Sequence, residues 1–500
     1  MNGNTVRGRW RRRASISALT VCFLLLAWLV PPLSHRARRL CPLRPDGISE
    51  SRAIPSFARQ TGMSCVVCHT TFPELTPFGR RFKINGFTMT TKPADVSDYS
   101  VTTDTHTTRR NLVLSYVSPI SYAMEIAYGK WNRPLNDPNA GNGGGPASTA
   151  QSQADTFLFP EQFSLFYGGR VTDNVGTWIQ LTYDGTAGQV GLDNTEVRYA
   201  DHSNDREWVW GTYANNSPGM QDAYNTPVAA PFSIPAFNVP SLYGTVGAGG
   251  LRAPLAGSLS GQVAGVGGYG FYHDSFYVDV AGYHSNVPGN VALSNPGLVS
   301  TGTVGGLVGV APYVRVAYEK DWGRHSVEIG AMDMNGRLVP GIIPNASMRS
   351  PTTDNQFEDT SVDWQYQYIG DDHIFSFLGA YTHERQRNNS LFVGTYYTNN
   401  TDYLDRTSLT TQYSYRRHYG GLVNWVNTTG TKDALQNGND GSPGNQYWAF
   451  ELDYMPWLNT KFLLQYDVYT VVNGNQSPYF GGNTKPSDNN SFIAGLWMAF

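Results

Sequence analysis

Charged side chains are scarce in this 500-residue chain, in which Lys, Arg, Asp and Glu make up 15%, against roughly 25% in typical globular proteins. A chain so poor in charge is not expected to form a helical soluble protein or a coiled coil. Basic residues are not in excess, with 36 Lys and Arg against 39 Asp and Glu. This balance disfavours nucleic-acid binding, which needs a basic face. Only four cysteines occur, which excludes a disulfide framework.

Aromatic residues, glycine and proline are abundant instead. The chain has 30 Tyr, 23 Phe, 12 Trp, 53 Gly and 29 Pro. From about residue 105 onward, apolar and polar residues alternate with period 2 between clusters of turn residues, and no convincing amphipathic helix is present. Residues 361–368, for example, are SVDWQYQY. One face of each such segment is apolar and the other is polar, which argues against a large soluble sandwich with a dry core.

Turns and loops of two kinds connect these segments. Short turns lie around residues 320–323, 370–372 and 455–459, whereas long loops rich in Gly, Asn and Ser separate the pairs that these turns join. This arrangement is typical of outer-membrane barrels, which have an even number of antiparallel strands. About 400 residues at roughly 25 per strand and loop predict about 16 strands. The sequence therefore predicts an all-β fold over residues 101–500, an outer-membrane antiparallel β-barrel, with soluble sandwiches and propellers as the alternative.

Two features of this region stand out. The chain ends SFIAGLWMAF, in which Phe492, Leu496 and Phe500 share one face, as expected for a closing strand with its aromatic residue at the membrane interface. Residues 217–262 are almost free of charge and contain six prolines. Because an irregular connection of this length is usually functional or disordered, we expect it to fold over or into the barrel near the N-terminal domain. A mobile surface loop is the alternative.

Residues 1–52 have a different composition, with ten Arg and two acidic residues. A basic stretch precedes an apolar run from Ala14 to Val30, which is the pattern of a secretory signal. The run is at the short limit for a transmembrane anchor. We therefore assign residues 1–52 to an export signal and basic leader.

The sharpest motif is Cys65-Val66-Val67-Cys68-His69, the C-x-x-C-H attachment signature of c-type haem. Two thiols at this spacing can each form a thioether with a haem vinyl group, and the adjacent imidazole can bind the iron. The alternatives are a thioredoxin-like dithiol, which needs a βαβ context, and half of a zinc site, which needs a second Cys or His pair. We therefore predict one covalently bound haem c and a monohaem plug domain over residues 53–100.

The residues after the motif predict a short helix. Thr76 can cap it with Pro77 at its first position, and Asn85-Gly86 is a natural stop. Residues 53–92 have five basic residues against Glu74 alone, a net charge of +4, whereas residues 93–500 have a net charge of −15. These charges predict a cationic plug seated electrostatically in an anionic barrel. Pairing of the arginines with haem propionates is the alternative.

The second axial ligand of the haem iron is a methionine or histidine in many such proteins. Met89 and His106 follow the motif most closely, and Met124 is a further candidate. We predict Met89, with His69 as the first ligand.

The segment AIPSFARQTGMSCVVCHTTFPELTPFGRRFKINGF, residues 53–87, closely resembles the start of the outer-membrane monohaem cytochrome-porins of iron-oxidising bacteria. The likeness lies in FARQTG before the haem motif and in P-E-L-T-P-F-G-R and F-K-I-N-G-F after it, and residues 215–227 also look family-like. It implies Cys65 and Cys68 as haem anchors, His69 as iron ligand and catalytic residue, and an iron(II) oxidase. The basic tract after the signal departs from this family.

The expected function is oxidation of extracellular Fe(II), with single electrons passing through the haem to a periplasmic c-type cytochrome or copper carrier. The barrel would lie in outer-membrane lipid, with the haem domain on the periplasmic side or in the lumen, and no nucleic acid is involved. Five acidic residues are assigned to loops: Asp354, Glu358, Asp359, Asp402 and Asp405. They are candidates for weak docking of Fe(II), and the alternative is that they are ordinary solvent-exposed carboxylates. The alternatives are a conduit for another extracellular donor or acceptor, and a haem-plugged solute-diffusion porin.

Overall fold

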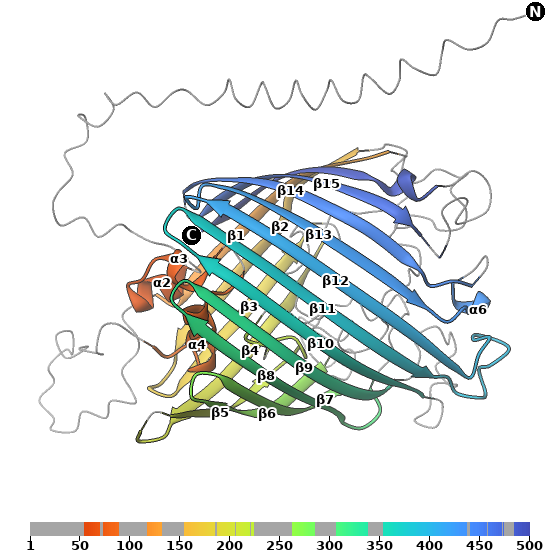
Figure 1. Cartoon of the computed structure of the whole chain (residues 1–500), viewed down its shortest axis with the longest axis horizontal. Helices are drawn as coiled ribbons and strands as arrows, with labels where there is room; N and C mark the ends of the chain where they lie inside the picture. The colour runs from red at the N-terminus through yellow and green to blue at the C-terminus, as the bar shows by residue number, and fades with distance from the viewer. Residues whose placement is uncertain are drawn as a thin grey trace, which may run out of the picture. The chain divides into compact units, whose positions relative to one another are not determined.

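The computed structural model describes residues 55–70, 74–89, 118–132, 155–185, 188–205, 207–220, 222–224, 263–285, 307–338, 354–437, 441–457, 459–472, 474 and 485–500. Within these ranges the chain forms a closed barrel of 16 antiparallel strands, preceded by three short helices (Figure 1). The predicted all-β fold and strand number are thus confirmed. The predicted export signal and leader, residues 90–117 and most of the proline-rich segment 217–262 lie outside the described residues.

The strands have the following bounds: β1 Ile120–Trp131, β2 Asp155–Arg170, β3 Val175–Asp184, β4 Gln189–His202, β5 Trp208–Asn215, β6 Val263–Tyr272, β7 Phe276–Ser285, β8 Ala311–Trp322, β9 His325–Leu338, β10 Asn355–Ile369, β11 His373–Arg387, β12 Thr401–Tyr415, β13 Tyr419–Gly430, β14 Asn445–Trp457, β15 Thr460–Val471 and β16 Ser491–Ala499. Two further short helices lie between strands, α6 Ala434–Asn437 and the 3-10 helix η8 Pro486–Asn489.

Each strand pairs with its neighbours in sequence, and β16 closes the barrel against β1 with Ala123 opposite Ala499. The last strand is therefore the closing strand that the C-terminal sequence predicts. At one end of the barrel, connections of five residues or fewer join β2–β3, β4–β5, β6–β7, β8–β9, β10–β11, β12–β13 and β14–β15. Because β1 begins and β16 ends beside these turns, we call this the short-turn end, and the opposite end the long-loop end. At the long-loop end the β3–β4 connection, residues 185–188, is also short, and the others are longer.

Side chains along the strands alternate between the lumen and the outer face. On β10, Asp363, Gln365 and Gln367 are buried on the lumen side, whereas Val362 on the outer face is 44% exposed. Large apolar side chains are exposed on the outer faces of other strands, among them Val280, Val316, Ile329, Leu452 and Leu464. An apolar outer band around a polar interior is the pattern of a barrel that lies in lipid. This architecture identifies an outer-membrane type of barrel.

Three short helices make up the N-terminal plug, which we define as residues 55–89: α2 Pro55–Thr61, α3 Cys65–Cys68 and α4 Pro77–Ile84. The side chain of Thr76 accepts a hydrogen bond from the Gly79 N–H and caps α4, and Pro77 occupies its first position. The helix ends at Asn85, and Gly86 follows with φ +69°. The predicted helix start and stop are thus confirmed. None of the helices in the described ranges has the length and apolarity needed to span a membrane.

Candidate functional site: the N-terminal plug and its seat

The C-x-x-C-H motif forms one helical turn and the residue after it. Cys65 and Cys68 begin and end α3, and the His69 N–H donates to the Cys65 carbonyl at 2.8 Å. His69 then pairs with Leu75 in an antiparallel bridge. Neither cysteine forms a disulfide, and burial raises the pKa of the Cys68 thiol to about 11. The turn therefore presents two reduced cysteines and a half-buried imidazole.

Helix α4 packs directly on this turn. The Thr76 N–H donates to the Cys68 carbonyl at 2.9 Å, and the Thr76 hydroxyl donates to the Val67 carbonyl at 2.5 Å. A Cβ atom on Gly79 would lie 2.2 Å from the Cys68 carbonyl oxygen. Glycine at position 79 thus permits the close approach of α4 to α3, and movement of α4 is transmitted to the motif.

These residues fit a c-type haem. Two thiols on one turn supply both anchoring groups, and the next residue supplies an imidazole for the iron. Apolar rings also pack together within the plug: Phe57 stacks on Phe87 with centroids 5.4 Å apart, and Phe82 meets Phe57 edge-on at 5.1 Å. Within the described ranges no group of three or more His, Cys, Asp or Glu residues could hold a metal ion. The haem itself stays a prediction.

The three candidates for the second ligand have different positions. Met89 is half-buried at the end of the plug, and its role as a ligand stays a prediction. Met124 lies next to the lumen-facing Glu125 on β1 and so faces outward, where it cannot reach the plug interior. His106 lies outside the described residues.

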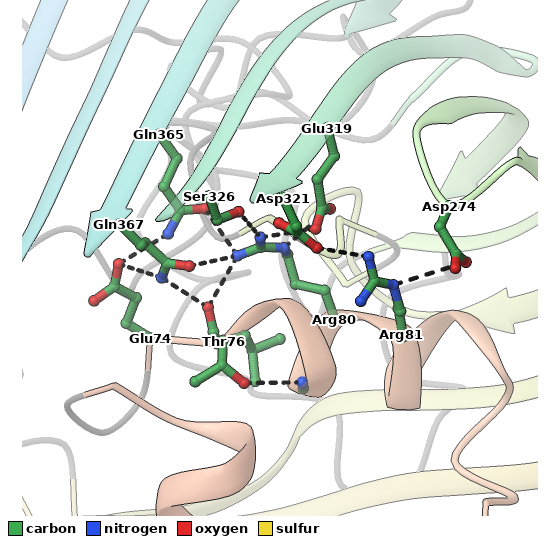
Figure 2. A network of polar contacts seen from close by, with 12 residues as sticks. Glu74, Thr76, Arg80, Arg81, Asp274, Glu319, Asp321, Ser326, Gln365 and Gln367 are labelled. Atoms are coloured by element: carbon green, nitrogen blue, oxygen red, sulfur yellow. Dashed lines mark hydrogen bonds and ion pairs between the residues drawn. The ribbon is translucent and has the colours of Figure 1, made fainter. Parts of the chain in front are cut away.

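Arg80 anchors the plug to the barrel wall (Figure 2). Its guanidinium forms a two-pronged ion pair with Glu319 of β8, at 2.9 Å from Nη2 and 3.2 Å from Nε. It also donates to Ser326 of β9 at 2.8 Å and to Gln367 of β10 at 2.9 Å. Arg80 and Glu319 are both about 1% exposed. This seat is a charge-assisted network closed off from water.

Other polar contacts surround this anchor. Glu74 accepts hydrogen bonds from the amides of Gln365 and Gln367 at 2.8 and 2.9 Å. Arg81 forms an ion pair with Asp321 at 2.6 Å, near the turn between β8 and β9. On the other side of the plug, Arg59 donates to the Ile120 carbonyl at the start of β1, and Arg417 in the β12–β13 turn donates to the Val66 carbonyl. The plug therefore lies at the short-turn end.

Apolar contacts complete the seat against β2 and β3. Phe57 lies 5.8 Å from Trp178 of β3, measured between ring centroids, and Trp178 meets Phe166 of β2 edge-on. A Cβ atom on Gly176 would lie 2.0 Å from the Gly86 carbonyl oxygen. The plug and the wall are therefore in close contact here. The electrostatic seat that the charge distribution predicts is present, together with this aromatic contact.

The long connection between β5 and β6 reaches the plug. Its described residues Asp222, Ala223 and Tyr224 are at most 1% exposed, and the Asp222 carbonyl accepts a hydrogen bond from Lys83 of α4 at 2.9 Å. Asp222 also forms an ion pair with Arg315 of β8 at 3.0 Å. For these residues, the expectation of a loop that folds into the barrel near the plug is confirmed.

The proposed acidic docking groups are mostly not loop residues. Glu358, Asp359, Asp402 and Asp405 lie within β10 and β12, which extend further than the sequence pattern indicated. Asp359 and Asp402 are buried. Asp405 bonds to Tyr381 and His383, and Asp354 forms an ion pair with Arg337. Asp354, Asp402 and Asp405 are thus engaged with protein groups, and the four strand residues correct the assignment to loops.

Sequence reasoning missed the partners of the plug. Glu319, Gln365 and Gln367 occupy polar positions of the period-2 pattern, so their direction into the lumen could be inferred. Their common target could not, because 239 to 287 residues separate each of them from Arg80.

Comparisons with solved structures find porin barrels. The outer-membrane channel DcaP of Acinetobacter baumannii has 12% sequence identity, covers 76% of this chain and 96% of its own, and gives a TM-score of 0.44. OmpF of Salmonella typhi in complex with daunomycin has 11% identity with 76% and 97% coverage and a TM-score of 0.44. An anion-selective porin of Comamonas acidovorans has 11% identity with 76% and 98% coverage and a TM-score of 0.42. No family model and no curated protein matches the chain. These values are too low to transfer any property of those proteins.

Proposed function

We propose that this protein is an outer-membrane c-type cytochrome that takes single electrons from extracellular Fe(II) and passes them to a periplasmic carrier. The observation that carries the proposal is the C-x-x-C-H turn on a plug that is anchored to a closed barrel by a buried ion pair. The choice of Fe(II) as the donor rests on the resemblance of residues 53–87 to iron-oxidising cytochrome-porins.

The chain's own residues have distinct tasks in this proposal. Cys65 and Cys68 would hold the haem covalently, and His69 would bind its iron. When bound there, the haem would supply a one-electron couple suited to the oxidation of one Fe(II) ion to Fe(III) at a time. Arg80 and the aromatic contacts fix the plug, because electron transfer requires the haem to stay at one place in the membrane.

The orientation follows from the barrel. Bacterial outer-membrane barrels have their short turns in the periplasm, so the plug at the short-turn end faces a periplasmic cytochrome or copper protein. The net charge of −15 over residues 93–500 favours the approach of cations such as Fe(II) through the summed field of the barrel.

A second candidate is a solute-diffusion porin whose haem segment acts as a plug. The outer-membrane type of barrel favours it, since such barrels commonly enclose channels. A conduit for another donor or acceptor is a variant of the first proposal. Conductance in planar bilayers separates the two classes, because a diffusion porin shows open-channel current and an insulated electron conduit does not.

The direct test uses purified, haem-loaded protein in detergent. We expect a c-type absorption spectrum that converts to the reduced form when Fe(II) is added. His69→Ala should abolish this response, whereas His202→Ala, at a half-exposed position at the end of β4, should not change it. An oxidised spectrum that Fe(II) leaves unchanged at the working pH refutes the iron-oxidase proposal, and channel current would then favour the porin.

A further inference from the structure

A loop from one end of the barrel touches a domain at the other end. The β5–β6 connection starts after Asn215, which pairs with Gly265 at the long-loop end. Nevertheless its residues 222–224 contact α4 of the plug, whose Arg81 forms an ion pair with Asp321 at the short-turn end. The connection therefore descends into the lumen far enough to bind the plug.

Tyr224 is the centre of this contact. Two guanidinium groups lie over its ring, that of Arg80 of the plug at 5.7 Å from the centroid and that of Arg315 of the wall at 5.3 Å. It also meets the ring of Tyr277 of β7 edge-on at 5.9 Å. All four side chains are buried to within 1%. Cation–π contacts are strongest when both groups are desolvated, so this position favours a strong interaction.

The hydroxyl of Tyr224 contributes differently. Among the described residues this buried group has no hydrogen-bond partner, and an unsatisfied buried hydroxyl is unfavourable. The contact therefore depends on the face of the ring. Two variants of Tyr224 therefore form a matched pair: Tyr224→Phe keeps the aromatic ring and loses only the hydroxyl, whereas Tyr224→Leu removes the ring.

A short path leads from Tyr224 to the haem motif. Arg80 follows Gly79, whose α-carbon packs against the Cys68 carbonyl without room for a Cβ atom. Thr76, on the same helix, bonds to both Val67 and Cys68. A change in the position of Arg80 therefore acts on the turn that bears Cys65 and Cys68.

We propose that Tyr224 and Asp222 are positioning residues: they form a clasp by which the loop from the long-loop end holds α4 and thereby fixes the haem-binding turn. The effect on the haem rests on the proposed function, whereas the clasp itself does not. By this arrangement a change in the loop on one side of the membrane alters the haem site near the other.

The test compares Tyr224→Leu with Tyr224→Phe in the full-length, haem-loaded protein, reduced chemically with dithionite so that no Fe(II) activity is needed. Heat-modifiable migration in gels first verifies that each barrel is folded. Tyr224→Leu should increase the rate of proteolytic release of the plug at least tenfold and shift the haem midpoint potential. Tyr224→Phe should match the wild type in both measurements.

Two results would overturn the proposal. One is a Tyr224→Leu protein with a folded barrel whose plug release and midpoint potential equal those of the wild type. The other is a Tyr224→Phe protein that behaves like Tyr224→Leu, which would assign the effect to the hydroxyl. If Tyr224 acts through Arg80, the double variant Arg80→Met/Tyr224→Leu should release its plug no faster than Arg80→Met alone; additive effects contradict this route.

The outcomes also separate the clasp from the proposed function. A wild-type protein without a c-type spectrum defeats the proposed function, but plug release in the same variants still tests the clasp. If Fe(II) reduces the haem but Tyr224→Leu leaves the rate of plug release unchanged, only the proposal about Tyr224 and Asp222 is refuted.

Discussion

The buried ion pair between Arg80 and Glu319 should be the main determinant of plug docking. Replacement of Glu319 by glutamine keeps the size and most of the hydrogen bonds of the side chain but removes its charge. The Arg80 guanidinium is then left buried beside the neutral Gln365, Gln367 and Ser326. Breaking one partner of a buried pair typically costs about 3–5 kcal/mol, because the remaining charge has no compensation.

That range sets the expected size of the effect. At roughly 1.4 kcal/mol per factor of ten, the undocked fraction of the plug should rise between about 10²-fold and 10⁴-fold in Glu319→Gln. The double variant Arg80→Met/Glu319→Gln should recover much of this loss, since no uncompensated charge remains. A double-mutant cycle then isolates the coupling between the two side chains.

Limited proteolysis of the folded barrel in detergent measures the undocked fraction, because a protease cleaves the plug only after it leaves its seat. Asp371→Asn, which neutralises an exposed carboxylate in the β10–β11 turn, is the matched control for the loss of one negative charge. If Glu319→Gln and this control release the plug equally slowly, the ion pair does not hold the plug and the reasoning fails.

Three further perturbations concern the plug itself. Gly79→Ala should displace α4 from Cys68 and lower haem incorporation, because the new Cβ atom would lie 2.2 Å from a backbone oxygen. Gly268→Ala, whose Cβ atom would have no atom nearer than 3.5 Å, should leave haem incorporation unchanged. Equal haem content in both variants contradicts the packing argument. Thr76→Ala should weaken plug docking by about 1 kcal/mol through loss of the helix cap, measured as faster proteolysis, with an unchanged rate as the opposing result. Burial lowers the pKa of Lys83 to about 8 from 10.5, so the docked plug binds fewer protons than the undocked plug between these values, and docking should strengthen as pH rises from about 8 to 10.5. Lys83→Met should flatten this dependence in a pH series of proteolysis rates; a slope that persists assigns it to another group.

Local signals accounted for much of the architecture. The alternation on residues 361–368 predicted which side chains of β10 face the lumen, because side-chain direction in a strand has period 2 whatever the strand pairs with. Thr76, Pro77 and Asn85-Gly86 predicted the bounds of α4, because helix ends depend on hydrogen bonds within a few residues. The predicted strand lengths at the long-loop end were less accurate. Strands that extend beyond the apolar band lose the alternation of apolar and polar residues by which a strand is recognised in the sequence. Asp402 and Asp405 were assigned to a loop for this reason.

The sequence by itself determined the barrel and the helix beside the motif, since each depends on neighbours in the chain, and the haem chemistry of Cys65, Cys68 and His69 stays a prediction from the same local pattern. It also predicted that a cationic plug would meet an anionic barrel, because net charge can be counted without coordinates. Only the tertiary structure decided that Arg80 meets Glu319 and that the ring of Tyr224 lies against Arg80 and Arg315. Such pairings depend on closure of the barrel, which brings together residues that no local pattern connects, from 91 positions apart for Tyr224 and Arg315 to 239 for Arg80 and Glu319.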